Sequence, residues 1–380
     1  MLSLALRLVM CMDSVKGFIK GNAVLMISLA AAVISAFIVP PSAAYLGYVD
    51  WSVIILLFCL MAVVAGLRSL GVFDALSGVL LSKTGSARMI AFILMNLCFF
   101  VSMLVTNDVA LITFVPLTVG LYSGCGMSSQ LIMTVVIETA AANLGSMMTP
   151  IGNPQNLFLF RHYQMGMGEF FGTVLLAGAA GYLLLCGSVL LVKKGSVRHE
   201  GERMSLKTGW RFWMYMAVFL VCVLSVAGLV NEYICLAVTV AAVAVSDYRL
   251  FARIDYPLLA TFICFFVFVG NIGSIEAVES FVAGLLSGRE LIVSAALSQV
   301  ISNVPAAAML ADFTDNSAGL LLGVNIGGLG TPVASLASLI SYRYYCADAD
   351  AEKGRYMAVF LAVNFVMLAV MLGSVFFILS

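Results

Sequence analysis

Two stretches of sequence decide the fold: "NLGSMMTPIGN" at residues 143–153 and "NIGGLGTPVAS" at residues 325–335. Each begins with Asn, has Gly two positions later, and carries Thr-Pro four positions after that Gly. Both lie inside long apolar tracts. Pro removes a backbone donor, and Gly permits backbone angles that other residues resist. The repeated pattern therefore predicts two helices that are each broken near the middle.

The composition around these stretches is that of a membrane protein. Of 380 residues, 63% are hydrophobic and only 10% are charged, with a mean hydropathy of +1.10. A soluble domain carries about 25% charged residues, and about 20 apolar residues suffice to cross a bilayer. We predict an all-α polytopic membrane protein. The nine Cys show no C-x-x-C spacing and the chain has no basic tract, so neither a metal site nor a nucleic-acid partner is expected.

Hydropathy predicts about nine full spans and two re-entrant helical hairpins, which enter and leave on one side of the membrane. The spans are expected at 22–39, 51–67, 128–160, 169–192, 211–230, 233–247, 258–272, 317–345 and 356–379. The hairpins are expected at 88–122 and 289–314, where polar residues interrupt apolar tracts. The spans 128–160 and 317–345 contain the two breaks and should be discontinuous.

The distribution of basic residues predicts the orientation. With the N-terminus in the cytoplasm, all but two of the 19 Lys and Arg fall on the inner side, as cytoplasmic loops require. We therefore expect a multi-pass protein of the inner (cytoplasmic) membrane. The predicted organisation is an N-terminal cytoplasmic or interfacial segment (1–21), a first repeat (22–192), a cytoplasmic linker (193–210) and a second repeat (211–380).

The two halves carry the same five elements in the same order. Each has a span ending in Gly (Gly66, Gly270), an amphipathic segment, a hairpin, a broken span and a plain span. The first hairpin should start inside and the second outside, so the repeats have inverted topology. Inverted repeats with discontinuous helices are typical of secondary transporters. The alternative, that Gly and Pro only kink ordinary helices, explains one motif but not the repeated order.

The breaks and the hairpin tips form the candidate site. Unwound backbone is tolerated in a membrane only where it lines a cavity or is buried in protein. Its freed carbonyls can bind a cation, and the N-terminal ends of half-helices can hold an anion. The candidate residues are Asn143, Gly145, Thr149, Pro150 and Asn153 at the first break, Asn325, Gly327, Thr331 and Pro332 at the second, Thr106, Asn107 and Asp108 at the first tip, and Ser302 and Asn303 at the second. Asn at a tip can alternatively serve as a local cap.

Two acids lie deep in the predicted spans, and no Lys or Arg is expected near them. An ionisable group in a membrane core is costly, which favours a functional role. We expect Asp108 to bind Na⁺ or carry a proton, with a Na⁺ site near Asn107, Asp108 and Asn143. The corresponding residue of the second half is Val304. Glu138 is either a proton relay or a protonated acid with one interhelical hydrogen bond.

Four segments resemble the ion transporter superfamily that includes citrate and dicarboxylate carriers, arsenite permeases and a sodium/proton antiporter branch. The segments are "TNDVALITFVPL" (106–117), "NLGSMMTPIGNPQNLFL" (143–159), "SQVISNVP" (298–305) and "NIGGLGTP" (325–332). The chain looks most like small bacterial inner-membrane permeases of that group. The resemblance implies two inverted repeats, a homodimer and elevator-type movement. Dicarboxylate carriers have Ser-Asn-Thr at both tips. Here the Asn is shared at both tips, and the third residue differs at both.

We therefore predict a secondary active transporter of a small anion, a carboxylate or an inorganic oxyanion, coupled to Na⁺ or H⁺. The alternatives are a Na⁺/H⁺ antiporter and an exporter of arsenite or a similar oxyacid. Expected partners are the solute, the coupling ion and the lipid bilayer, with no other cofactor. The chain has no P-loop and no H-E-x-x-H motif, which argues against ATP drive and against an intramembrane enzyme.

Overall fold

The computed structural model describes residues 22–81, 85–122, 127–196 and 208–379, and its regular elements there are all helices. The predicted N-terminal segment 1–21 and most of the linker lie outside the described residues, so these two boundaries stay predictions. The first half contains α2 (Ala23–Ile38), α3 (Ala44–Tyr48), α4 (Trp51–Ser69), α5 (Val72–Leu81), α6 (Ala87–Val105), α7 (Asn107–Tyr122), α8 (Ser128–Ser146), α9 (Pro154–His162), α10 (Met167–Ser188) and the 3₁₀ turn η1 (Val189–Leu191).

The second half follows with a similar order of elements. It contains α11 (Trp210–Val226), α12 (Glu232–Asp247), η2 (Tyr248–Arg253), α13 (Tyr256–Gly273), α14 (Glu276–Leu286), α15 (Glu290–Ile301), α16 (Asn303–Leu310), η3 (Ala311–Phe313), α17 (Ser317–Ile326), α18 (Leu336–Tyr345) and α19 (Lys353–Leu379). Both predicted breaks are present. Helix α8 ends at Ser146 before α9 begins, and α17 ends at Ile326 before α18 begins.

The number of spans differs from the predicted nine. Within the described residues, six helices are long and apolar enough to cross a membrane: α4, α6, α10 with η1, α12 with η2, α13 and α19. The bent pair α14 and α15, with an angle of 112°, could add a seventh. The breaks divide two predicted spans into short helices. Helices α2 and α11, with 16 and 17 residues, fall below the length of about 20 residues that a span needs. Helix α6, predicted as one hairpin arm, has 19 residues and is long enough to span.

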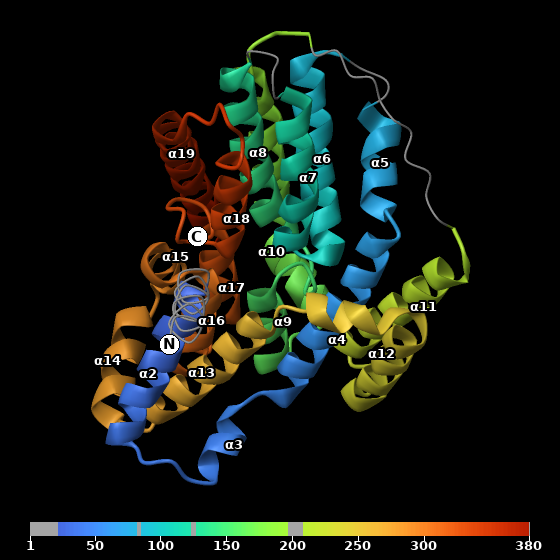
Figure 1. Cartoon of the computed structure of the whole chain (residues 1–380). Coiled ribbons are helices and arrows are strands. Elements are labelled where there is room, and N and C mark those ends of the chain that lie inside the picture. The colour runs from blue at the N-terminus through green and yellow to red at the C-terminus, as the bar shows by residue number, and fades with distance from the viewer. Residues whose placement is uncertain (1–21, 82–84, 123–126, 197–207, 380) are drawn as a thin grey trace, which may run out of the picture.

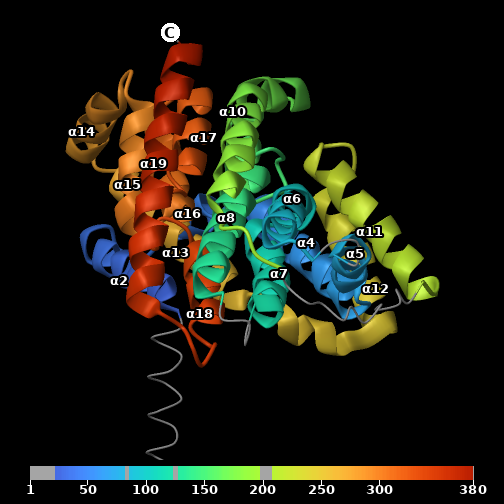
Figure 2. The ribbon, with the colours of Figure 1, turned by 90° about the horizontal axis from the view of Figure 1, so that it is seen from above.

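The helices form a row and a bundle (Figure 1). In the row, α2 packs on α13, α13 contacts α4, and α4 packs on α11 and α12. The bundle contains α6 to α10 together with α15 to α19. Figure 2 shows α11 and α12 on one side of the molecule and α14 and α15 on the other, with α6, α7 and α8 between them. The row and the bundle meet where α9 contacts α4 and where α16 contacts α13.

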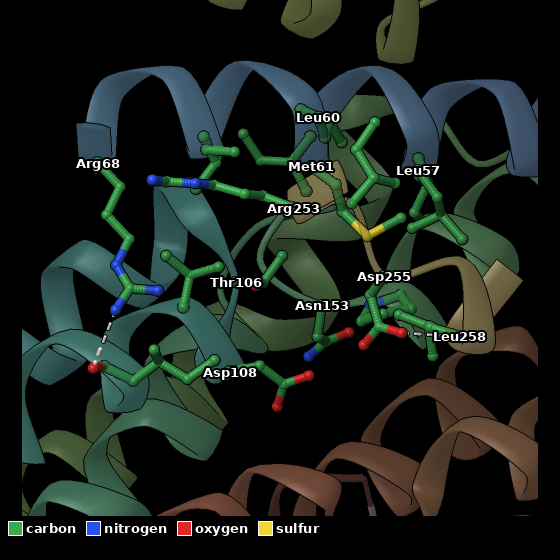
Figure 3. Close-up of a pocket in the computed structure, with 18 of the residues that line it drawn as sticks. Leu57, Leu60, Met61, Arg68, Thr106, Asp108, Asn153, Arg253, Asp255 and Leu258 are labelled. Carbon is green, nitrogen blue, oxygen red and sulfur yellow. Dashed lines mark hydrogen bonds between the residues drawn. The ribbon is translucent and has the colours of Figure 1, made fainter. Parts of the chain in front are cut away.

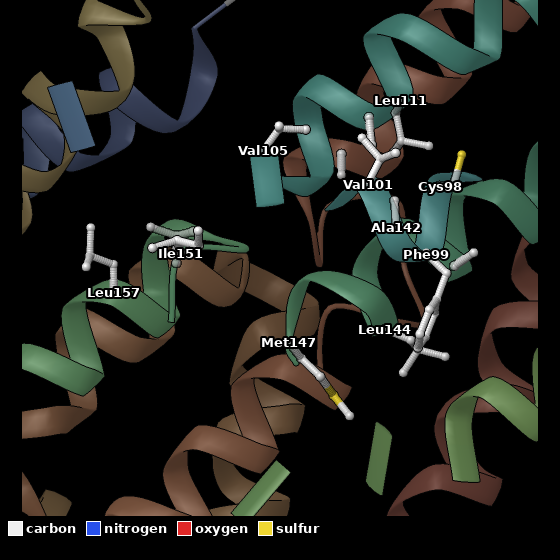
Figure 4. Packing of buried hydrophobic residues seen from close by; sticks show 14 of the residues in the cluster. Cys98, Phe99, Val101, Val105, Leu111, Ala142, Leu144, Met147, Ile151 and Leu157 are labelled. Atoms are coloured by element: carbon white, nitrogen blue, oxygen red, sulfur yellow. The ribbon is translucent and has the colours of Figure 1, made fainter. Parts of the chain in front are cut away.

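Close helix packing holds each break against the hairpin of its own half. Apolar side chains of α6, α7 and α8, such as Val101, Leu111 and Ala142, pack together in the bundle (Figure 4). Near the end of α8, Gly145 lies so close to α6 that a Cβ there would overlap the carbonyl of Phe99. Near the end of α17, a Cβ on Gly327 would lie 2.8 Å from the Cα of Ala295. Only Gly allows the backbones to approach so closely.

In the row, helices of one half pack against helices of the other half. Helix α12 of the second half packs on α4, and α2 of the first half packs on α13. The two Gly near the ends of α4 and α13 each face a Tyr ring. Gly66 faces Tyr215 of α11, and Gly270 faces Tyr48 of α3. Within the described residues the first half has no helix that corresponds to α11, and the short α3 supplies the ring instead.

We predict that Gly66→Ala destabilises the protein. The new Cβ would lie 2.5 Å from the Tyr215 ring, so α4 and α11 would have to move apart. Overpacking of this kind costs about 1–3 kcal/mol, which should lower the thermal unfolding midpoint of the protein in detergent. Gly172→Ala in α10 is the matched control, because nothing lies within 4 Å of a Cβ there. Equal midpoints for the two variants would contradict the packing described.

Candidate functional site

The two breaks are joined by a reciprocal pair of hydrogen bonds. Asn153 Nδ2 donates to Asn325 Oδ1 at 2.9 Å, and Ser335 Oγ donates to Asn143 Oδ1 at 3.0 Å. Asn153 lies just before α9 and reaches Asn325 near the end of α17. Ser335 lies just before α18 and reaches Asn143 in the last turn of α8. All four side chains are buried. An unmade hydrogen bond at such a place is costly, so the pair ties the two unwound segments to each other.

Two amides that the sequence analysis did not select hold the carbonyls freed by the breaks. Asn156 Nδ2 donates to the carbonyls of Ser146, Met147 and Thr149 at 3.0–3.3 Å. Gln299 Nε2 donates to the carbonyls of Gly327 and Leu329 at 2.7 and 3.0 Å. Fewer of these carbonyls are therefore open to a cation than the sequence suggested. Both amides lie within the motifs already quoted, and a search for donors next to unwound carbonyls could have found them.

The Thr of each break is bonded to the hairpin of its own half. The hydroxyl of Thr149 donates to the carbonyl of Met103, and that of Thr331 donates to the carbonyl of Gln299 at 2.9 Å. Met103 and Gln299 each lie three residues before a hairpin tip. Pro150 is buried and Pro332 is half-buried within the unwound segments. Both Thr hydroxyls thus fix the breaks in place.

The two hairpin tips have the same unusual backbone conformation. Thr106 and Ser302 have φ values of 87° and 78°, a region that residues other than Gly rarely adopt. Such strain is typical of functional sites and of turns held by their surroundings. At the first tip, Asn107 Nδ2 donates to Asn143 Oδ1 at 3.0 Å. At the second, the backbone N–H of Asn303 donates to the carbonyl of Ala334 at 2.9 Å. Each tip therefore contacts the break of its own half.

A cavity of about 370 Å³ lies between the row and the first half of the bundle (Figure 3). It is lined by Leu57, Leu60, Met61, Val64, Ala65, Arg68, Thr106, Asp108, Val109, Ile112, Ile151, Asn153, Pro154, Leu157, Arg253, Ile254, Asp255, Pro257 and Leu258. The predicted site residues Thr106, Asp108 and Asn153 are among them. Those of the second half (Ser302, Asn303, Asn325, Gly327, Thr331 and Pro332) do not line this cavity.

Three charged residues of the cavity were not predicted: Arg68, Arg253 and Asp255. Arg68 Nη2 donates to the carbonyl of Ile112 at 3.3 Å. The Asp255 carboxylate caps α13, accepting from the N–H of Leu258 at 3.0 Å. The sequence placed the two Arg on the inner surface, away from the acids. The folded chain brings both to the cavity that Asp108 lines (Figure 3).

The Asp108 carboxylate is the least engaged group of the site. Its backbone N–H donates to Asn107 Oδ1 at 3.0 Å, but we find no hydrogen bond or ion pair to the carboxylate among the described residues. Asn107 Oδ1 and Asn143 Oδ1 each already accept hydrogen bonds from the protein. Of the three residues predicted near Na⁺, Asp108 therefore offers the free oxygens.

Glu138 lies outside the cavity and is fully buried in α8. Its Oε1 lies 2.6 Å from Thr118 Oγ1, and Thr118 Oγ1 also lies 3.1 Å from the carbonyl of Phe114. A hydroxyl has one proton to donate. If Thr118 donates to Phe114, the acid itself must donate to Thr118, which suits a protonated carboxyl. Glu138 Oε2 has no hydrogen-bond partner in the described part of the chain.

The sequence matches a family model over residues 12–321, and that model is described as "Citrate transporter". The chain is 33% identical to an uncharacterized transporter of Methanocaldococcus jannaschii, over 82% of this chain and 85% of that protein. It is 31% identical to inner membrane protein YbiR of Escherichia coli, over 78% of this chain and 80% of that protein. A putative transporter arsB of Dictyostelium discoideum is 24% identical over 40% of this chain and 26% of its own length. These similarities agree with the superfamily resemblance.

We predict that Asn325→Ala destabilises the joined breaks. It leaves Asn153 Nδ2 with one fewer acceptor and Asn156 Oδ1 without the donor that lies 2.6 Å away. Leaving such buried groups unpaired costs about 1–3 kcal/mol each. The thermal unfolding midpoint should fall clearly below that of Ser374→Ala, a control whose lost bond is made only to the carbonyl of Met371 in its own helix. A midpoint equal to that of the control would show that the reciprocal bonds contribute little.

Proposed function

The chain belongs to the citrate transporter family, and we propose that it is a secondary active transporter of a small anion across the cytoplasmic membrane. The proposed solute is a carboxylate or an inorganic oxyanion, and the proposed coupling ion is Na⁺ or H⁺. One observation carries the proposal. Two broken helices are joined by reciprocal hydrogen bonds, beside a cavity that contains Asp108, an acid without a partner among the described residues. Discontinuous helices at a solute site are typical of transporters.

Equivalent contacts in the two halves support inverted repeats. The residues of the two breaks correspond at a constant offset, since 325 − 143 and 335 − 153 are both 182. Their hydrogen bonds form a symmetric pair, both tips have positive φ values, and both Thr bond three residues before a tip. A pseudo-twofold relation between the two halves accounts for the paired hydrogen bonds, the φ values of the tips and the contacts of the two Thr. In the proposed mechanism, this symmetry lets one site open to either side of the membrane.

The first break and the first hairpin tip together supply features that suit an anion and a cation. The cavity contains Asn153 and Pro154, where α9 begins, and a helix N-terminus carries partial positive charge. The Asp108 carboxylate in the same cavity suits Na⁺ or a proton. We propose that the bundle moves against the row during transport, which follows from the cavity lying between them. A homodimer and a cytoplasmic N-terminus remain part of the proposal.

A cation/proton antiporter is the second candidate. It is favoured by two acids with unpaired oxygens, Asp108 in the cavity and Glu138 in α8. Export of arsenite or a similar oxyacid is a further variant, supported only by the partial match to the putative transporter arsB.

Asp108→Asn tests the coupling. The amide has nearly the same shape but cannot exchange a proton or offer a negative charge to Na⁺. We expect proteoliposomes with the variant to lose concentrative uptake driven by a Na⁺ or H⁺ gradient, by about 5- to 150-fold, as loss of a coupling free energy of about 1–3 kcal/mol would give. The assay compares citrate, succinate, sulfate and phosphate as solutes. Unchanged uptake with unchanged cation dependence would refute a coupling role for Asp108.

Glu138→Gln separates the two candidate functions. The Gln amide can donate to Thr118 as a protonated acid does, so for an anion transporter we expect folding and uptake to stay within about twofold of wild type. Glu138→Leu is the control, because it loses the hydrogen bond and should lower the unfolding midpoint. A Gln variant with normal folding but no transport would instead support a proton relay and the antiporter.

A further inference from the structure

The cavity contains two cationic and two anionic side chains from four different segments: Arg68 of α4, Arg253 of η2, Asp108 of α7, and Asp255 before α13. We infer that Arg253, assisted by Arg68, binds the transported anion, and that neutralisation of Asp108 is what makes the cavity favourable to that anion. This inference rests on the proposed function and adds to it the groups that recognise the solute.

Arg253 has the free donors that an anion site needs. Figure 3 shows its side chain extending toward the side of the cavity where Arg68 lies. Among the described residues we find no hydrogen bond or ion pair to the Arg253 guanidinium, and neither acid of the cavity lies within ion-pair distance of either Arg. A guanidinium presents several donors in a planar fork that matches a carboxylate or an oxyanion. Arg68 uses one nitrogen on the carbonyl of Ile112 and keeps other donors.

The two acids of the cavity are not equivalent. The Asp255 carboxylate accepts from the backbone of α13 as a helix cap, which stabilises its negative charge. The Asp108 carboxylate has no such partner in the described part of the chain. Asp108 is therefore the acid that a proton or Na⁺ would neutralise first.

The charges of the lining suggest how coupling arises. With both acids ionised, two Arg and two Asp sum to zero. When Asp108 takes a proton or Na⁺, the lining carries a net charge of +1 and attracts an anion. The remaining lining residues are apolar apart from Thr106 and Asn153, while Arg68, Arg253 and Asp255 are exposed at the mouth of the cavity and Asp108 is half-buried. By linkage, the bound anion must in turn favour neutralisation of Asp108.

A different explanation of the two Arg is that they only mark the cytoplasmic side and lie among water and lipid headgroups. Under that explanation, removing the charge of Arg253 leaves anion binding unchanged. Arg253 is the better residue to substitute, because Arg68 also bonds to the backbone of α7 and its loss could disturb the hairpin.

The test measures thermal unfolding of the purified full-length protein in detergent. The probes are citrate, succinate, sulfate and phosphate, titrated at constant ionic strength with Na⁺ or choline, and at low and neutral pH. Ligands that bind the native state raise the unfolding midpoint by mass action. The variants are Arg253→Gln, Arg253→Lys and Asp108→Asn. Arg343→Gln is the matched control, since Arg343 is an exposed Arg of α18 outside the cavity.

For wild type and Arg343→Gln, we expect at least one anion to raise the midpoint only with Na⁺ or at low pH. For Arg253→Gln, the required anion concentration should rise at least about tenfold, with partial rescue in Arg253→Lys. Asp108→Asn should respond to the anion without Na⁺ and at neutral pH. A normal anion response in Arg253→Gln overturns the inference but leaves the proposed function intact. No response of wild type to any of the four anions overturns both.

Discussion

The structure depends on the reciprocal hydrogen bonds between the two breaks. Unwound backbone is unfavourable inside an apolar protein because its polar groups lose both helical partners and water. Here each break supplies a side-chain hydrogen-bond donor to a buried Asn of the other break. Asn153 reaches Asn325, Ser335 reaches Asn143, and Asn156 and Gln299 bind the carbonyls that the breaks expose. The two breaks are therefore one polar unit, and neither is fully satisfied alone.

This unit fixes the hairpins as well. The tips can hold positive φ values at Thr106 and Ser302 only because their surroundings leave them no better conformation. Asn107 bonds to the first break, and the backbone of Asn303 bonds to the second. Gly145 and Gly327 bring the broken helices close enough to the hairpins for these bonds to form. The result is a bundle in which the breaks and the hairpin tips are bonded to one another.

The two halves share a backbone plan but differ in chemistry, and the difference bears on function. The first tip has Asp108 where the second has Val304, and the described cavity contains first-half site residues only. The cavity contains two Arg, a helix N-terminus and an acid that has no partner in the part of the chain that the structure describes. These groups suit a charged solute and a coupling cation. Glu138, by contrast, is buried away from the cavity with a hydroxyl as its one hydrogen-bond partner among the described residues. Its surroundings suit a neutral acid better than a solute ligand.

The sequence by itself determined the all-helical membrane class, the two breaks and the two tips, because Pro, Gly and Asn in an apolar tract restrict the backbone locally. It also identified Asp108 as the acid to test. The nine predicted spans are not confirmed, because the count included the two broken helices, α2 and α11, and six helices of the described residues are long and apolar enough to cross a membrane. Only the tertiary structure decided which side chains meet across the halves. Asn153 and Asn325 are far apart in sequence, and no local pattern marks them as partners. The distribution of basic residues along the chain assigned Arg68 and Arg253 to the inner surface. It carries no information about which distant side chains lie near them. Their place in the cavity depends on how α4 and α13 pack against the bundle, which only long-range contacts determine.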